Sequence, residues 1–234
     1  MMTPDLAADL AQASFALAQR FSAGATMWCV APALAPHAQH VAVEFVHPVI
    51  VGKRALPAVA LTGHDLVGQV RVSARAGDVV IAVAGAADPD VCAVMRRGAA
   101  WGVTTIWIGN GERPTAGAAD HVLWLDDPDP VLSATGEFVL LYHLLWELTH
   151  VCFEHPGLLV PRPQDCADDV CITCADEGRP AEVLPGTHGT ATSLTPVRTA
   201  KGTETVATDL IGPLSPGDVV LVHAGLAISK LGEA

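Results

Sequence analysis

Cys171 and Cys174, separated by Ile172 and Thr173, form a C-x-x-C motif, the sharpest chemical signal in the sequence. Such a pair can serve as a redox dithiol, as half of a zinc site, or as a thiolate ligand for another soft metal fragment. A redox pair is expected at a helix N-terminus in a βαβ setting, whereas the residues that follow have a strand pattern. A structural zinc needs four ligands. The residues that could complete the set are Cys166, His155, His188 and His223.

A second group of possible ligands lies in a predicted helix of the first half. His37, His40 and Glu44 are spaced i, i+3 and i+7, so they could share one helix face and hold a metal ion. We interpret this group instead as a polar helix face beside a vestigial pocket.

A third group, His143, Glu147 and His150, lies in a predicted helix further along the chain and shares one face of it. We interpret this face first as a packing or oligomer surface and only second as a ligand set.

The elements that must position these residues differ between the two halves of the chain. In the first half, apolar runs alternate with helical patterns, which predicts an α/β fold with a parallel sheet covered on both faces. Strands are expected at 25–31, 79–84, 103–108 and 122–125, and helices at 5–22, 36–45, 88–100 and 137–153.

The second half has the pattern of a small all-β unit. Residues 154–169 contain three prolines and several acids, which is typical of a linker. Short strands are expected at 179–184, 191–197, 204–210 and 219–223. The predicted organisation is therefore an α/β domain at 1–153, a linker at 154–169 and a small β-barrel at 170–234.

Composition limits the possible partners. Lys and Arg number 13 against 25 Asp and Glu, so the formal net charge is −12. Phosphate contacts need clustered basic residues, so we expect no nucleic-acid partner. No apolar run reaches the roughly 18 residues of a membrane span, and the acidic N-terminus is unlike an export signal. These features predict a cytoplasmic protein without membrane contacts.

The first half resembles the SIS family of phosphosugar-binding domains, in particular its phosphoheptose-isomerase branch. The resemblance covers roughly residues 5–153 and rests on the segments 38–45, 77–109 and 119–125. It implies an SIS-like sandwich that oligomerises through its helices, so we expect a homodimer.

The same resemblance implies a glutamate and a histidine that transfer protons. Glu44 occupies the glutamate position, but Phe138 stands where the histidine is expected, and His143, one turn further on, is not assigned that role. The family's two phosphate-binding turns correspond to 31–36 and 84–89, which contain no hydroxyl side chain, and Asp88 would repel a phosphate. The expectation is a non-catalytic scaffold with a vestigial sugar-phosphate site at Glu44, His40 and Asp88.

The second half resembles the HypC/HupF hydrogenase-maturation chaperones. The resemblance rests on the segment 217–231 and on the stretch from Cys171 to Val183. It implies an OB-like barrel in which Cys171, with His223 nearby and Cys174 as a possible second ligand, transiently binds the Fe(CN)2(CO) fragment of nickel–iron hydrogenases. It also implies two partners, a maturation scaffold protein and the hydrogenase large-subunit precursor. In the family, however, the cysteine usually follows the initiator Met, whereas Cys171 is internal.

Together these features favour a maturation chaperone that carries an iron fragment and is not an enzyme. One alternative is a phosphosugar isomerase or sugar-phosphate-binding SIS protein with a β appendage. Another is an interaction module stabilised by zinc bound to Cys166, Cys171, Cys174 and a histidine.

Overall fold

The computed structural model describes residues 3–125, 136–159, 178–185 and 194–232. The chain divides into two units, Met1–Met95 with Val103–Val160 and Arg96–Gly102 with Pro161–Ala234. The predicted boundaries at 153/154 and 169/170 stay predictions, and the second of them lies in 160–177, outside the described residues.

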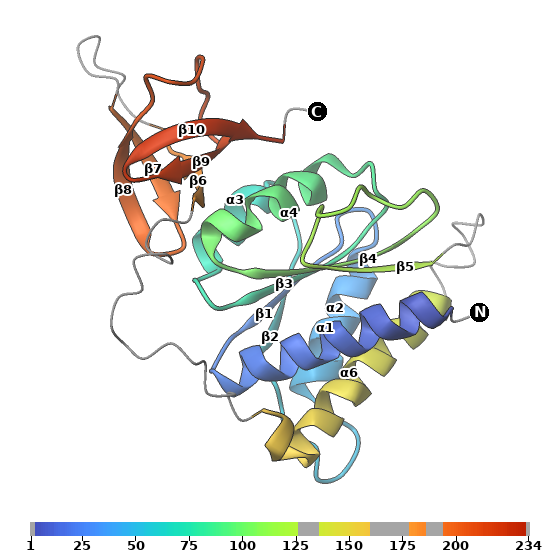
Figure 1. Ribbon diagram of the computed structural model, residues 1–234. Helices are drawn as coiled ribbons and strands as arrows, with labels where there is room; N and C mark the ends of the chain where they lie inside the picture. The colour runs from blue at the N-terminus through green and yellow to red at the C-terminus, as the bar shows by residue number, and fades with distance from the viewer. Residues whose placement is uncertain (1–2, 126–135, 160–177, 186–193, 233–234) are drawn as a thin grey trace. The chain divides into compact units, whose positions relative to one another are not determined.

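A parallel sheet of five strands, in the order β2-β1-β3-β4-β5, forms the centre of the first unit (Figure 1). Its strands are β1 (Met27–Val30), β2 (Ala58–Leu61), β3 (Val79–Val83), β4 (Thr104–Asn110) and β5 (His121–Leu125). Its helices are α1 (Pro4–Ser22), α2 (Ala35–Val46), α3 (Leu66–Ser73), the first part of α4 (Pro89–Trp101, with the residues from Arg96 onward in the second unit) and α6 (Phe138–Glu154), followed by the short 3-10 helix η2 (Pro156–Leu158). The predicted α/β class is confirmed.

Apolar side chains from both faces of the sheet explain why helices cover it on two sides. Every residue of β3 is buried, as expected for a central strand of a parallel sheet. One cluster joins α1, α2 and α6 to the sheet through residues such as Leu17, Ile81 and Tyr142. Figure 1 shows α3 and α4 on the opposite face.

Local signals in the sequence set the helix starts. The Thr3 hydroxyl accepts a hydrogen bond from the Leu6 N–H at 3.2 Å, and Pro4 occupies the first turn of α1. The Asp88 carboxylate accepts hydrogen bonds from the N–H groups of Asp90 and Val91 at 3.1 and 3.0 Å, at the start of α4. Asp88, expected in a vestigial sugar-phosphate site, therefore caps a helix.

The second unit contains a five-stranded closed barrel in the order β10-β8-β7-β6-β9. Its strands are β6 (Arg179–Val183), β7 (Leu194–Thr199), β8 (Gly202–Ala207), β9 (Val219–His223) and β10 (Leu226–Leu231). Most neighbours are antiparallel, but β10 and β8 pair in parallel, so the sheet is mixed. A second, mixed sheet is thus confirmed, whereas the OB-like assignment is not.

None of the described helices combines the length and apolar character that a bilayer span requires. The cytoplasmic location stays a prediction.

Candidate functional site

Helices α2 and α6 lie in contact and bring together three side chains that can bind or transfer protons. His40 and Glu44 stand one turn apart on α2, and His143 comes from α6. The Glu44 Oε1 atom lies 3.1 Å from His40 Nε2 and 3.5 Å from His143 Nε2, and the two Nε2 atoms are 3.4 Å apart. We call His40, Glu44 and His143 the histidine–glutamate cluster.

Solvent reaches the cluster. The side chains of His40, Glu44 and His143 are 38%, 23% and 43% exposed. A small molecule or an ion can therefore contact all three without local unfolding.

Tyr142 supports the cluster from the buried side. Its hydroxyl lies 2.7 Å from His40 Nδ1 and 3.4 Å from His37 Nδ1. Burial raises the pKa of Tyr142 to about 12, and the nearby Glu44 carboxylate adds to that shift. The hydroxyl therefore stays protonated at neutral pH. Because a hydroxyl can donate or accept, the same contact can fix either tautomer of His40.

The structure replaces one member of the possible ligand group His37, His40 and Glu44, which the sequence favoured as a polar helix face. His37 is buried, with its ring edge-on to Phe138 and Tyr142. His143, which was expected on a packing or oligomer surface, occupies the third position instead. Phe138 is buried as well, so the histidine that faces Glu44 is His143.

The other two residues of the α6 face, His150 and Glu147, have contacts outside the histidine–glutamate cluster. His150 is buried, with its two ring nitrogens 2.9 Å from the Trp146 carbonyl and 3.0 Å from the Arg54 carbonyl. Glu147 lies 3.5 Å from Lys53 Nζ. The contacts of His150 fit its interpretation as a packing group, whereas Glu147 is partly exposed and forms an ion pair.

The cluster has the donor set of a divalent-cation site. Two imidazole nitrogens and one carboxylate oxygen lie within 4.8 Å of one another. Two histidines and a carboxylate suit zinc with one position left open, and a second hydrogen bond to a ligand histidine is the usual way to orient it. Without a metal, the same atoms form a carboxylate–imidazole pair suited to proton transfer.

The two turns that correspond to the phosphate-binding turns of the SIS family follow β1 and β3, which are neighbours in the sheet. Residues 31–36 and 84–89 therefore meet at the carboxyl edge of the sheet. Neither segment contains Ser, Thr, Lys or Arg. Any phosphate there would depend on backbone N–H groups.

The predicted thiolate site cannot be placed. Cys166, Cys171, Cys174 and His188 lie outside the described residues. His223 ends β9, opposite Leu226 of β10. The zinc alternative and the transient iron fragment stay untested.

Solved structures similar to this chain share the fold of its first unit. A phosphoheptose isomerase from Francisella tularensis has a TM-score of 0.54 and 16% identity, with 61% of this chain and 85% of that chain covered. A phosphoheptose isomerase from Neisseria gonorrhoeae has a TM-score of 0.53 and 19% identity, with 62% and 86% covered. No protein-family model and no curated protein matches the sequence. The chain thus has a phosphoheptose-isomerase-like SIS fold over about 60% of its length.

These neighbours overturn the hydrogenase-maturation function. They agree with the phosphosugar alternative, and none of the comparisons supports a HypC/HupF chaperone. The segment 217–231 also has a local explanation: Gly217 has a positive φ in the turn before β9, and Ala224 and Gly225 have positive φ in the tight β9–β10 turn. Much of the motif is what a short hairpin requires, so it is weaker support for a family than the sequence suggested.

Proposed function

We propose that the first unit is an aldose–ketose isomerase that acts on a sugar or sugar phosphate at the histidine–glutamate cluster. One observation carries the proposal: a carboxylate on α2 lies within 3.5 Å of imidazoles from both α2 and α6. The similar fold of phosphoheptose isomerases supports the substrate class. The expectation of a non-catalytic scaffold is untested, and the cluster is our reason for proposing the opposite.

The reaction needs two proton movements and no redox partner. Glu44 takes the proton from C2 of the aldose and returns it to C1, while the C2–H electron pair becomes the C1=C2 bond of an enediol. His143 donates a proton to O1 as that bond forms and accepts one from O2 as the ketose carbonyl forms. General acid–base groups of this kind typically contribute about 10²- to 10⁴-fold each.

His40 positions this pair. Its Nε2 contacts the Glu44 oxygen that also faces His143, and Tyr142 fixes its ring through Nδ1. When His40 Nδ1 accepts from the Tyr142 hydroxyl, the ring carries its proton on Nε2 and donates it to Glu44.

A divalent cation held by His40, Glu44 and His143 would polarise the sugar carbonyl. In that state the Tyr142 hydroxyl would accept from His40 Nδ1, which leaves the Nε2 lone pair for the ligand role. The proposal of acid–base catalysis does not depend on the ion.

The experiment is an aldose–ketose conversion assay with sedoheptulose 7-phosphate and fructose 6-phosphate, run with and without a chelator. Glu44→Gln and His143→Asn should each lower kcat by at least about 100-fold. Glu147→Gln is the matched control, because Glu147 is a partly exposed carboxylate on α6 outside the cluster. It should change kcat by less than about twofold, which is within the error of the assay. Turnover that survives Glu44→Gln unchanged would contradict the proposal.

A further inference from the structure

A second concave site lies at the amino ends of β4 and β5, where the last turns of α1 pass over the sheet. It is a cavity of about 440 Å³, lined in part by Gln19 and Arg20 of α1, Thr104 at the start of β4, and His121 at the start of β5. Its volume falls in the range of small-molecule pockets. The turns at 31–36 and 84–89 follow the carboxyl ends of their strands, so this cavity occupies the other edge of the sheet.

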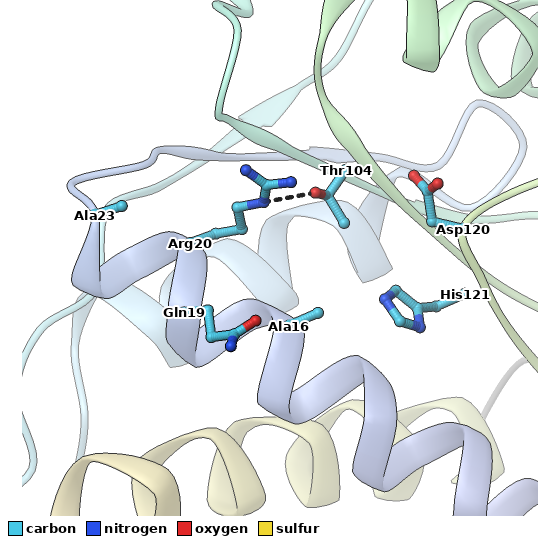
Figure 2. A pocket seen from close by; sticks show the side chains of 7 residues that line it. All are labelled: Ala16, Gln19, Arg20, Ala23, Thr104, Asp120 and His121. Carbon is cyan, nitrogen blue, oxygen red and sulfur yellow. Dashed lines mark hydrogen bonds between the residues drawn. The ribbon is translucent and has the colours of Figure 1, made fainter. Parts of the chain in front are cut away.

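Arg20 is the cation of this cavity; its side chain is exposed to solvent, and a hydrogen bond orients its guanidinium. The Arg20 Nε–H donates to the Thr104 hydroxyl at 2.8 Å (Figure 2). Thr104 is buried at the start of β4 and so provides a rigid acceptor. Within the described part of the chain, the two terminal nitrogens of Arg20 have no hydrogen-bond or ion-pair partner. They present a ready-made fork of N–H donors.

The other polar groups add little charge to the cavity. Both Thr105 donors, the N–H and the hydroxyl, bind Asp120 Oδ2 at 2.8 Å, so this oxygen is occupied by β4. Burial lowers the pKa of His121, an effect that outweighs the opposing influence of Asp120 and Asp9. His121 is therefore neutral at pH 7 and can donate or accept one hydrogen bond. Figure 2 shows the His121 ring, the Gln19 amide and the Arg20 guanidinium around the same space.

We propose that this cavity binds a small organic carboxylate, whose two oxygens are held by the terminal nitrogens of Arg20. A planar carboxylate matches the spacing of a guanidinium fork. A phosphate dianion fits less well, because the lining offers one fixed cation while Asp120 and Asp9 place negative charge nearby. The amide of Gln19 and the ring of His121 would contact the remainder of the ligand.

The test is a saturation-transfer and shift-perturbation NMR titration of the full chain with butyrate, a monocarboxylate, with inorganic phosphate and, as a cation control, with methylammonium. Butyrate should bind saturably with a dissociation constant on the order of millimolar, and more tightly than phosphate. Arg20→Gln should weaken butyrate binding by at least about tenfold, the loss expected for a charge-assisted hydrogen-bond pair.

Two further variants separate binding from folding. Arg54→Gln removes an exposed cation that does not line the cavity, and it should leave butyrate affinity within about twofold of wild type. Ala16→Phe places a ring in the cavity, keeps Arg20, and should abolish binding while far-ultraviolet circular dichroism stays unchanged. The proposal is overturned if wild type shows no saturable butyrate binding, if phosphate binds more tightly, or if a folded Arg20→Gln variant binds butyrate as wild type does.

Discussion

His143 Nε2 on α6 lies 3.5 Å from Glu44 Oε1 on α2, and this contact defines the candidate site of the first unit. Glu44 also lies 3.1 Å from His40 Nε2, so one carboxylate oxygen faces two imidazoles. Neither helix alone contains this arrangement. The packing of α2 against α6 creates it.

The first prediction concerns Tyr142. Tyr142→Phe removes the hydroxyl that lies 2.7 Å from His40 Nδ1 and keeps the buried ring. Because the hydroxyl fixes the His40 tautomer, the variant should lower either kcat or zinc affinity by about 10- to 100-fold, as loss of an outer-shell partner usually does. Zinc affinity is measured by competition with a chromophoric chelator, and kcat against pH in the conversion assay. An unchanged zinc affinity together with an unchanged pH profile would show that Tyr142 has no positioning role.

The second prediction concerns the phosphate group of the substrate. Residues 31–36 and 84–89 offer no hydroxyl or basic side chain, and the Asp88 carboxylate occupies N–H groups at the start of α4. The phosphate should therefore raise kcat/KM by less than about tenfold over the unphosphorylated sugar, since a pair of charge-assisted hydrogen bonds would contribute more than that. The comparison is between fructose and fructose 6-phosphate at equal ionic strength. A thousandfold preference for the phosphate ester would mean that these turns bind phosphate through their backbone.

The third prediction concerns Asp78, which ties together the starts of β1 and β3. Its carboxylate accepts hydrogen bonds from the Thr26 N–H at 2.9 Å, the Trp28 Nε1–H at 3.0 Å and the Arg75 N–H at 3.0 Å. Asp78→Ala should reduce the free energy of unfolding by about 2–4 kcal/mol, because it leaves several donors unsatisfied. Thr3→Ala, which removes the exposed cap of α1, is the control and should cost about 1 kcal/mol. Equal losses in urea denaturation would contradict this account.

The fourth prediction concerns the pH dependence of the Lys53–Glu154 pair. The Lys53 Nζ atom lies 2.6 Å from Glu154 Oε1, and this hydrogen bond is the main cause of a raised Lys53 pKa and a lowered Glu154 pKa. A carboxyl group whose pKa is lowered by folding stabilises the folded protein above its pKa in the unfolded chain, and this stabilisation is lost as pH falls through its pKa in the folded protein. A lysine whose pKa is raised by folding stabilises the folded protein below its pKa in the unfolded chain, and this stabilisation is lost as pH rises through its pKa in the folded protein.

Lys53→Met should therefore be less stable than wild type at neutral pH, and the difference should shrink toward both acidic and strongly alkaline pH. Because Glu154 is exposed, the effect should be small and weaker at high salt. Urea denaturation of the two proteins at several pH values measures the difference. A difference that is constant with pH would assign the role of Lys53 to packing against Trp146 rather than to charge.

The strands that the sequence predicted best are those whose burial is complete. The run 79–84 is apolar throughout and follows the Gly77-Asp78 turn, and β3 occupies Val79–Val83. In contrast, β2 is a four-residue edge strand with one fully buried residue, Ala58, so it carries no clear periodic signal. Strong burial on both faces produces a pattern that short edge strands lack.

Part of the candidate site could also be predicted. His40 and Glu44 share a helix face by their spacing alone, since residues four apart meet on one side of a helix. His143 could not be added in this way, because its position opposite Glu44 depends on how α2 and α6 pack. The position of the family's histidine falls on Phe138, which is buried, whereas the partly exposed His143 on the same helix faces Glu44.

The most direct test of the central claim is deuterium incorporation at C2 of the aldose product or C1 of the ketose, followed by proton NMR in D2O. The wild-type protein should incorporate deuterium from the solvent into the sugar during turnover. Glu44→Gln should reduce this exchange by at least about 100-fold, and Glu147→Gln should exchange at the wild-type rate. Absence of exchange in the wild type with all tested sugars and sugar phosphates, with or without added zinc, would contradict the assignment of the histidine–glutamate cluster as an isomerase site.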